Sequence, residues 1–275
     1  MNEHASGMDR ADRVAPGPDR TITLEGIHNL RDYGGYEARA GTLKRGLLWR
    51  SGQHAEATPA DLDVIHDLDL RTIIDLRGDT ERGQYPCLRH SQFDAIVLFE
   101  PGETASGHGR AVHEEFADRV RDEASAHQAM ATLYRELPWR PALVGTYRLY
   151  FDALAHRDGA SLLHCFAGKD RTGLAAALVH RILGVHADDV MDDYLLTNTA
   201  GNSEARIAAG AEHLRGSGKT MDDAAFRKLM SVHEDFLDNA FDAIIQRHGT
   251  IEAYARDVLG VTPAVTAAME ARLVD

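Results

Sequence analysis

Residues 162–179 read LLHCFAGKDRTGLAAALV, which predicts a buried strand, a tight loop and a helix in succession. Cys165 directly follows the strand, and Arg171 stands six positions later at the expected start of the helix. The backbone N–H groups between them can form a nest for an anion, and the positive end of the helix adds to the attraction. The same field favours the thiolate of Cys165 over its thiol and makes it nucleophilic. A merely structural cysteine is the alternative, which the spacing to Arg171 disfavours.

Short apolar runs of β type recur along the chain, at 47–49, 72–76, 95–98 and 161–164. Their continuous apolar character predicts strands that are buried on both faces, as in a parallel or mixed sheet covered by helices. Amphipathic patterns lie between these runs, and the C-terminal third carries helical patterns alone. The sequence therefore predicts an α/β fold with a central, mostly parallel sheet flanked by helices.

The chain length of 275 residues fits one large domain. Residues 1–20 are polar and without periodicity, which predicts a loose N-terminal arm, and no linker divides 21–275. The stretch 101–141 is long and highly charged, and we expect a helical insertion over one edge of the sheet. A packed helix pair is favoured over a mobile lid, because amphipathic spacing carries no information about motion.

Composition excludes several classes of function. The 30 Lys and Arg residues against 43 Asp and Glu residues give a net charge of −13, which argues against a general nucleic-acid or anionic-membrane surface. No apolar run approaches the ~18 residues of a membrane-spanning helix, so stable membrane insertion is not expected. The N-terminus lacks the apolar core of a secretory signal, which predicts a cytoplasmic protein, with export by another route left open. No Cys/His cluster has zinc-site spacing, and neither a metal nor a cofactor is expected.

The loop from His164 to Gly173 reads HCFAGKDRTG and resembles the signature of the cysteine-dependent protein tyrosine phosphatases. More narrowly, it is similar to the HCxxGKDRTG loop of a bacterial tyrosine/lipid phosphatase family. Other motifs that match this family are GIHNLRDYGG at 26–35, RSG at 50–52, IDLR at 74–77 and DYLLTN at 193–198. The resemblance implies a phosphatase-like α/β domain over 21–275. It also suggests that five residues frame the pocket, as scaffold first and site second: Asn29, Arg31, Asp32, Arg50 and Arg77.

This resemblance implies a two-step phosphoryl transfer without a metal. Cys165 attacks phosphorus, the alcohol or phenol leaves, and water then hydrolyses the cysteinyl-phosphate. Arg171 and the loop amides stabilise the charge on the phosphoryl oxygens, and Thr172 is expected to donate its hydroxyl to the sulfur in the second step. The loop residues expected to bind the phosphate are Phe166, Ala167, Gly168, Lys169 and Thr172.

The general acid has two candidates. The resemblance assigns this duty to Asp170, whose alternative role is to cap the helix. Asp75 ends a predicted strand, where ligand sites of such sheets gather, and its alternative role is to form a salt bridge. For Lys169 two roles remain open: it binds a second phosphate, or it is a solvated lysine with only a general electrostatic effect. His164 is expected to bond to backbone carbonyls and shape the loop rather than to act as a base.

The sequence therefore predicts a cysteine-based phosphatase for phosphotyrosine in proteins, with side activity on phosphoserine/threonine or phosphoinositides and inorganic phosphate as product. Alternatives are a primarily phosphoinositide-directed phosphatase, and a pseudophosphatase that binds phosphorylated partners, which the presence of both Cys165 and Arg171 disfavours. A sulfur-transfer or arsenate-reducing enzyme is disfavoured by the continuation of the loop. Cys87 is expected to be a plain half-buried cysteine rather than a redox partner of Cys165.

Overall fold

The computed structural model describes residues 20–104, 120–200, 204, 207 and 222–275. The predicted N-terminal arm, apart from Arg20, lies outside these residues, as do positions 105–119 of the expected insertion. Arg20 is 3% exposed and donates hydrogen bonds to the carbonyls of Asp32 and Gly34, so it belongs to the folded part. None of the described helices is both long and apolar enough to cross a lipid bilayer.

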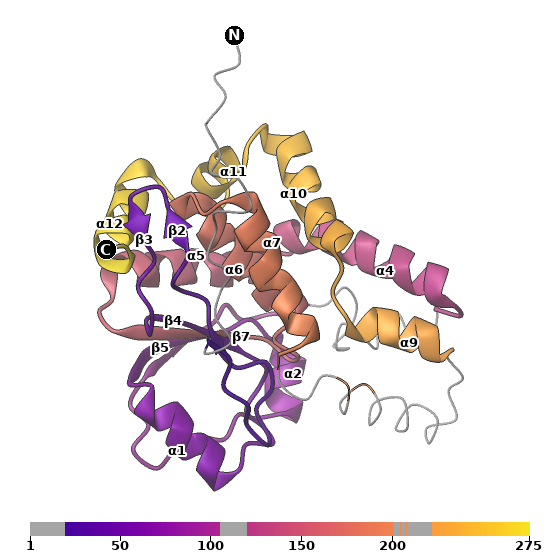
Figure 1. The fold of residues 1–275 in the computed structure, drawn as a ribbon, viewed down its shortest axis with the longest axis horizontal. Helices are drawn as coiled ribbons and strands as arrows, with labels where there is room; N and C mark the ends of the chain where they lie inside the picture. Colours follow the sequence, from indigo (N-terminus) through magenta and orange to yellow (C-terminus); the bar gives the residue numbers. More distant parts are fainter. Residues whose placement is uncertain (1–19, 105–119, 201–203, 205–206, 208–221) are drawn as a thin grey trace.

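A five-stranded sheet forms the centre of the described structure, in the order β1-β4-β7-β5-β6 (Figure 1). The strands β4, β7, β5 and β6 are parallel to one another, and β1 pairs antiparallel with β4 at one edge. The prediction of an α/β fold with a mostly parallel sheet is confirmed. The strands of this sheet are β1 (Arg31–Asp32), β4 (Leu48–Ser51), β5 (Leu70–Asp75), β6 (Ile96–Leu98) and β7 (Ala160–His164). A separate hairpin joins β2 (Glu37–Ala38) to β3 (Gly41–Thr42).

Alternating side chains of the central strands enter two different apolar cores. Ile73 and Leu162 pack in the smaller core, together with Ile65 of α1 (Pro59–Asp67). Ile74 and Leu163 pack in the larger core, which the other helices build. Because successive side chains of a strand point to opposite faces, both faces of the sheet must be covered, and this explains the continuous apolar runs in the sequence.

Helices cover both faces of the sheet, with α1 on one side and α5, α6 and α7 on the other (Figure 1). The helix α1 begins after Thr58, because Thr58 and Asp61 form a capping box around Pro59. The remaining helices are α2 (Asp79–Gln84), α4 (Glu123–Glu136), η3 (Leu137–Trp139), α5 (Pro141–His156), α6 (Asp170–Leu183), α7 (Ala187–Leu195), η4 (Leu196–Asn198), α9 (Asp223–Met230), α10 (Glu234–His248), α11 (Ile251–Asp257) and α12 (Pro263–Leu273).

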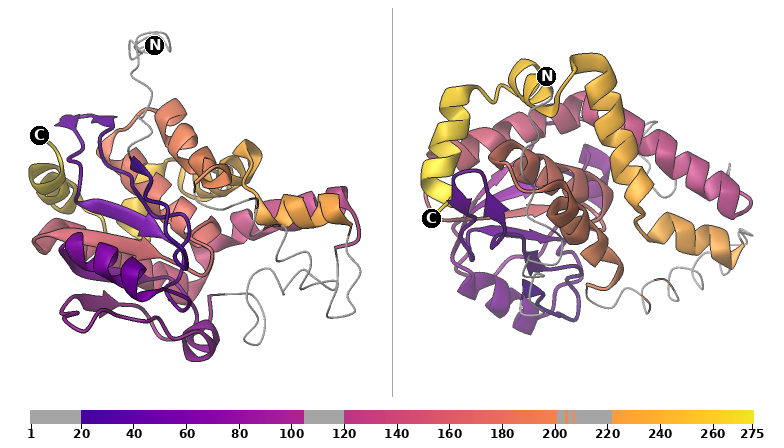
Figure 2. Two further views of the ribbon diagram at one scale, coloured as in Figure 1. Left: turned by 60° about the horizontal axis from the view of Figure 1, so that its bottom comes forward. Right: turned by 45° about the horizontal axis from the view of Figure 1, so that its top comes forward.

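Within the stretch 101–141, the structure describes α4 and η3. The helix α4 packs against α9 and α10, which come from a distant part of the sequence. Figure 2 shows α4 and α9 side by side, extending away from the sheet. The inner face of α4 carries Met130, Leu133 and Tyr134, each buried. The helix is therefore anchored to the body of the protein along its C-terminal half.

Three parallel strands end together at one edge of the sheet. His164 at the end of β7 lies opposite Ser51 of β4 on one side and Asp75 of β5 on the other. The chain segments that follow these strands therefore emerge side by side. Ligand sites of parallel sheets form at this carboxyl edge, and the HCFAGKDRTG loop follows the central strand of the three.

Candidate active site

The loop 165–169 connects β7 to α6 and lies tightly against the segment that follows β4. Gly168 has φ +66°, and a Cβ atom there would approach the Ser51 carbonyl oxygen to 2.4 Å. Only glycine combines this left-handed conformation with such a close approach. Cys165 is 2% exposed at the start of the loop.

Two carbonyl groups of the loop accept hydrogen bonds from the surrounding protein, whereas three of its backbone N–H groups bond to no protein acceptor among the described residues. The Phe166 carbonyl accepts a hydrogen bond of 3.0 Å from the Gln53 N–H, and the Gly168 carbonyl accepts from two buried side chains. Within the described part of the chain, no protein acceptor bonds to the backbone N–H groups of Ala167, Gly168 or Lys169. Successive unclaimed N–H groups beside a helix start form the kind of nest that binds a tetrahedral oxyanion.

Two side chains hold the Gly168 carbonyl in its orientation. Asn29 Nδ2 donates to this oxygen at 2.7 Å, and Arg50 Nη2 donates at 3.2 Å. Arg31 donates in turn to Asn29 Oδ1. Arg50 Nη1 also donates to Asp193 Oδ2 at 3.0 Å. These buried residues contact the back of the loop.

Asp193 is the counter-ion of this cationic group. It lies beneath Arg31 and Arg50 and is 1% exposed. Burial alone would raise the pKa of Asp193, but the two guanidinium groups outweigh it and lower the pKa to about 2. Its carboxylate is therefore ionised throughout the physiological range and holds both arginines in place.

Arg171 is fixed by a carboxylate that sequence reasoning missed. Its Nη2 donates to Glu81 Oε1 at 2.8 Å, its Nη1 donates to Glu81 Oε2, and Nη1 also donates to Thr104 Oγ1 at 2.7 Å. Burial opposes the charge of Arg171, but Glu81 outweighs it and raises the pKa of the guanidinium. Glu81 thus occupies the edge between the two terminal nitrogens. The other edge of the guanidinium is formed by Nε and Nη2. Among the described residues, Nε has no acceptor.

Asp170 lies in a hydrogen-bond chain of two tyrosines. Tyr134 of α4 donates its hydroxyl to Asp170 Oδ1 at 2.9 Å, and Tyr194 of α7 donates to the Tyr134 hydroxyl at 2.7 Å. The Lys169 ammonium lies 3.4 Å from the same Oδ1 atom. The Tyr134 hydroxyl and the Lys169 ammonium therefore both interact with Oδ1 of Asp170 and not with Oδ2. Tyr134 is a second site residue that the sequence reasoning missed.

Lys169 is held by the C-terminal end of α9. Its ammonium donates to the carbonyls of Leu229 and Ser231, the latter at 3.2 Å. The residue is 6% exposed, so the reading of a solvated lysine is wrong. The last carbonyls of a helix carry partial negative charge and lack intrahelical donors, which explains why a buried ammonium binds there.

Asp75 forms an ion pair with Arg77 behind the loop. Arg77 Nε and Nη2 donate to its two carboxylate oxygens at 2.9 and 2.7 Å. Burial would raise the pKa of Asp75, but His164 and Arg77 outweigh it and lower the pKa. Asp75 is thus the salt-bridge partner that its alternative reading described, and it holds no proton to donate near neutral pH.

His164 and Thr172 complete the loop's surroundings. Burial lowers the pKa of His164 to about 4, so the ring is neutral, and its Nδ1 lies 3.3 Å from the Cys165 carbonyl oxygen. The Thr172 hydroxyl is buried and bonds to no group of the described residues. The bond from Thr172 to the sulfur of Cys165 that the sequence analysis expected is therefore not formed in this conformation.

An aromatic pair flanks the loop, and Cys87 lies behind it. The rings of Tyr85 and Phe166 meet edge to face at 5.1 Å between centroids, and Tyr85 is 39% exposed. The half-buried Cys87 accepts hydrogen bonds at its sulfur from Arg77 Nη2 at 3.1 Å and from the His54 N–H at 3.4 Å.

Across the described ranges, no group of three or more His, Cys, Asp or Glu side chains is arranged to hold a metal ion.

A family model and related sequences place the chain in one family. The family model described as "Tyrosine phosphatase family" matches residues 22–275. A Cupriavidus necator protein whose name assigns it to the tyrosine-protein phosphatases is 31% identical over 250 residues, covering 88% of this chain and 85% of that protein. The triple specificity protein phosphatase PtpB of Mycobacterium tuberculosis is 26% identical over 270 residues, covering 88% and 94%. Among solved structures, TpbA of P. aeruginosa in complex with pTyr matches with a TM-score of 0.33 and 19% identity, over 78% of this chain and 96% of that chain.

Proposed function

The chain belongs to the tyrosine phosphatase family, and we propose that it hydrolyses phosphotyrosine in proteins through a cysteinyl-phosphate formed on Cys165. The observation that carries this proposal is the orientation of the loop. Its carbonyls bond to the protein, while the amides of Ala167, Gly168 and Lys169 stay unclaimed at the start of α6. An arrangement of this kind attracts a phosphoryl dianion and stabilises an adjacent thiolate.

In the first step, the Cys165 thiolate attacks phosphorus in line with the leaving oxygen. The S–P bond forms while the P–O bond to the phenol breaks, and the leaving oxygen takes a proton from Asp170. The loop amides and the Nε–Nη2 edge of Arg171 bind the three equatorial oxygens. Glu81 supports this role because it occupies the opposite edge and fixes the plane of the guanidinium.

In the second step, water attacks the cysteinyl-phosphate. Asp170, now a carboxylate, accepts a proton from the attacking water, and the electrons of the S–P bond return to sulfur. The Thr172 hydroxyl, which has no partner among the described residues, donates to the departing thiolate in this step. The products are inorganic phosphate and the regenerated Cys165 thiolate, with no metal required for either step.

The surroundings of the loop favour an aromatic phosphomonoester as substrate. The rings of Tyr85 and Phe166 offer an apolar wall next to the nucleophile, which suits the phenyl group of phosphotyrosine. Lys169 is the residue that could bind a second phosphate. Its ammonium is engaged by the carbonyls of Leu229 and Ser231, so the conformation described here favours a substrate with one phosphate.

A phosphoinositide phosphatase is the second candidate. PtpB of Mycobacterium tuberculosis is named for triple specificity, and a lysine inside the loop offers the extra charge that a substrate with several phosphates would use. Such a substrate requires Lys169 to exchange the α9 carbonyls for a phosphate. The variant Lys169→Gln separates the two candidates, because it should lower phosphoinositide turnover far more than phosphotyrosine turnover only if the lysine contacts a second phosphate.

The experiment that tests the proposed function is a kinetic panel on purified protein. Phosphotyrosine, phosphoserine and phosphothreonine peptides are compared with phosphoinositides, with Cys165→Ser as the inactive control. We expect the highest kcat/KM for phosphotyrosine peptides and no turnover by the control. A higher kcat/KM for phosphoinositides would overturn the substrate assignment, and turnover by Cys165→Ser would overturn the nucleophile.

A further inference from the structure

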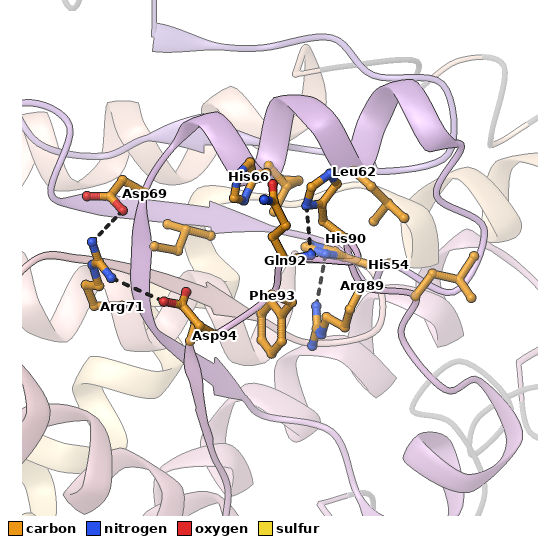
Figure 3. A pocket seen from close by; sticks show the side chains of 14 residues that line it. His54, Leu62, His66, Asp69, Arg71, Arg89, His90, Gln92, Phe93 and Asp94 are labelled. Carbon is orange, nitrogen blue, oxygen red and sulfur yellow. Dashed lines mark hydrogen bonds and ion pairs between the residues drawn. The ribbon is translucent and has the colours of Figure 1, made fainter.

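A second cavity lies between α1 and residues 88–95, on the face of the sheet opposite α6 (Figure 3). Its volume is about 150 Å³, a size at which an apolar cavity holds a molecule of benzene. Charged side chains stand at its two ends, Asp69, Arg71 and Asp94 at one and Arg89 at the other, and His66 and Gln92 lie between them. None of its lining residues belongs to the loop 165–171. The floor is built by Leu62, Ile65, Leu70 and Phe93.

Arg89 stands at one end of this cavity (Figure 3). Its guanidinium carbon lies 5.0 Å from the centre of the Phe93 ring, and Nη1 donates to His54 Nδ1 at 3.2 Å. Among the described residues, no carboxylate forms an ion pair with Arg89. Two groups raise the pKa of Arg89: Cys87, which also hydrogen-bonds to its side chain, and Asp75, whose carboxylate is already paired with Arg77.

The imidazole that accepts a hydrogen bond from Arg89 carries no charge to offset the guanidinium. Burial lowers the pKa of His54 well below its usual value, so the imidazole is neutral and accepts at Nδ1. The opposite nitrogen, Nε2, lies 3.1 Å from the Ser51 hydroxyl and carries the ring's proton. Burial lowers the pKa of Arg89 itself, although Cys87 and Asp75 oppose this effect. A half-buried cation in this position favours the binding of an anion.

At the other end of the cavity, unlike at the Arg89 end, carboxylates compensate the arginine. Arg71 there forms ion pairs with Asp69 at 2.8 Å and with Asp94 at 3.4 Å (Figure 3). Its guanidinium is therefore already compensated by two carboxylates. An anion that enters the cavity is attracted to the Arg89 end and not to the Arg71 end.

We propose that this cavity is a binding site for a small organic oxyanion, a carboxylate or a phosphorus oxyanion with an apolar body, whose charged group pairs with Arg89. The apolar body lies on Phe93 and the aliphatic side chains of the floor. His66 and His90, whose rings stack at 4.3 Å between centroids, form part of the wall. The size of the cavity limits the ligand to about one six-membered ring.

The site borders the catalytic loop through a single short segment. The His54 ring stacks on His164 at 5.5 Å between centroids, and the neighbouring Gln53 N–H bonds to the Phe166 carbonyl. His54 thus lines the cavity, while the adjacent Gln53 bonds to the catalytic loop. An anion on Arg89 does not occupy the place of the substrate phosphate.

The proposal is tested by calorimetric titration of the full-length protein with its catalytic loop saturated by orthovanadate, so that only binding elsewhere is measured. The ligands are benzoate, phenylphosphonate and, as the uncharged match, benzamide. We expect benzoate or phenylphosphonate to bind with one site per chain, and benzamide to bind at least about tenfold more weakly, the factor that one lost charge-assisted contact produces. The tighter of the two anions identifies the headgroup. Failure of both anions to bind, or equal binding of benzamide, overturns the proposal.

Two substitutions place the bound anion. Arg89→Gln should weaken binding of the anion at least about tenfold, whereas Arg71→Gln removes a cation from the same cavity and should leave the affinity within about twofold. Equal effects of the two substitutions would contradict the assignment to Arg89. If Arg89→Gln fails to fold, the comparison of benzoate with benzamide on the unaltered protein still decides the question of charge.

Discussion

The side-chain amide of Asn29 donates a hydrogen bond of 2.7 Å to the carbonyl oxygen of Gly168, although 139 positions separate the two residues in the sequence. Both residues have positive φ angles, +58° for Asn29 and +66° for Gly168. Asparagine tolerates this region better than most residues. The bond turns the Gly168 carbonyl away from the anion nest, so that the amides of the loop stay available for a phosphoryl group.

The substitution Asn29→Asp tests this relationship. It keeps the size of the side chain but places a carboxylate oxygen against the Gly168 carbonyl, so the donor is lost and the two oxygens repel. We expect kcat/KM for a phosphotyrosine peptide to fall by about 10- to 100-fold, the equivalent of about 1–3 kcal/mol for an unsatisfied buried group. The inhibition constant for inorganic phosphate should rise in parallel. A variant that folds and binds phosphate as the wild type does would show that the loop needs no such support.

The pairing of Glu81 with Arg171 gives a second prediction. Glu81→Gln removes the charge that compensates the buried guanidinium, and breaking a buried ion pair costs about 3–5 kcal/mol. We expect a lower free energy of unfolding and a loss of kcat that exceeds the change in KM, because Arg171 loses its fixed orientation. Glu103→Gln is the matched control, since Glu103 bonds to Thr80 of the same helix and does not contact Arg171. An unchanged kcat in Glu81→Gln would contradict this role.

Asp170 as proton donor gives a prediction that depends on the leaving group. Asp170→Asn should slow hydrolysis of an alkyl phosphate by about 10²–10⁴-fold, the usual contribution of general acid catalysis. Hydrolysis of para-nitrophenyl phosphate should change far less, because this leaving group barely needs a proton. Steady-state kinetics on both esters measures the difference. Equal losses on the two esters would reject Asp170 as the acid.

Tyr134→Phe is the matched variant for that experiment, because it removes only the hydroxyl that bonds to Asp170 Oδ1. A smaller loss with the same dependence on the leaving group indicates that Tyr134 orients the carboxyl group. A loss that is equal on both esters would assign Tyr134 to packing alone.

Buried neutral histidines predict how stability depends on pH. Burial lowers the pKa of His180 from its usual 6.5 to about 4, and its Nε2 donates to the Tyr33 carbonyl at 2.7 Å. Because the folded-state pKa is depressed, this stability is present above pH 6.5 and is lost as the pH falls towards 4. His180 alone should lower the free energy of unfolding by about 2 kcal/mol between pH 7 and pH 5.

Urea unfolding at the two pH values measures this effect. The variant His180→Gln should show a correspondingly weaker dependence on pH, since glutamine has no proton to gain. The same dependence in the variant and the wild type would contradict the assignment of a neutral, buried His180.

The strand–loop–helix unit around Cys165 could be predicted from sequence because its signals are local. An apolar run ends at His164, a glycine permits the turn, and an uninterrupted apolar and small-residue pattern follows in α6. The layered α/β architecture was predictable for the same reason. Strands that are covered on both faces must be apolar throughout, and the runs near β5 and β7 show this directly.

The contacts that orient the site could not be predicted, because they join distant elements. Glu81 reaches Arg171 across 90 positions, and in the sequence it is only the third residue of a short helix, where it also accepts the Gly78 N–H as a cap. Tyr134 lies on the buried stripe of α4, a pattern typical of any core tyrosine. The direction of Lys169 depends on where α9 ends in space, which no local pattern encodes.

The central claim is that the phosphoryl group is transferred to Cys165. The most direct measurement is mass spectrometry of the protein after rapid acid quenching during turnover of a phosphotyrosine peptide. We expect the peptide containing Cys165 to carry one phosphoryl group, the signal to accumulate in Asp170→Asn, and Cys165→Ser to show none at this position. Turnover without any phosphorylated cysteine peptide, or a phosphoryl group on another residue of the active wild type, would contradict it.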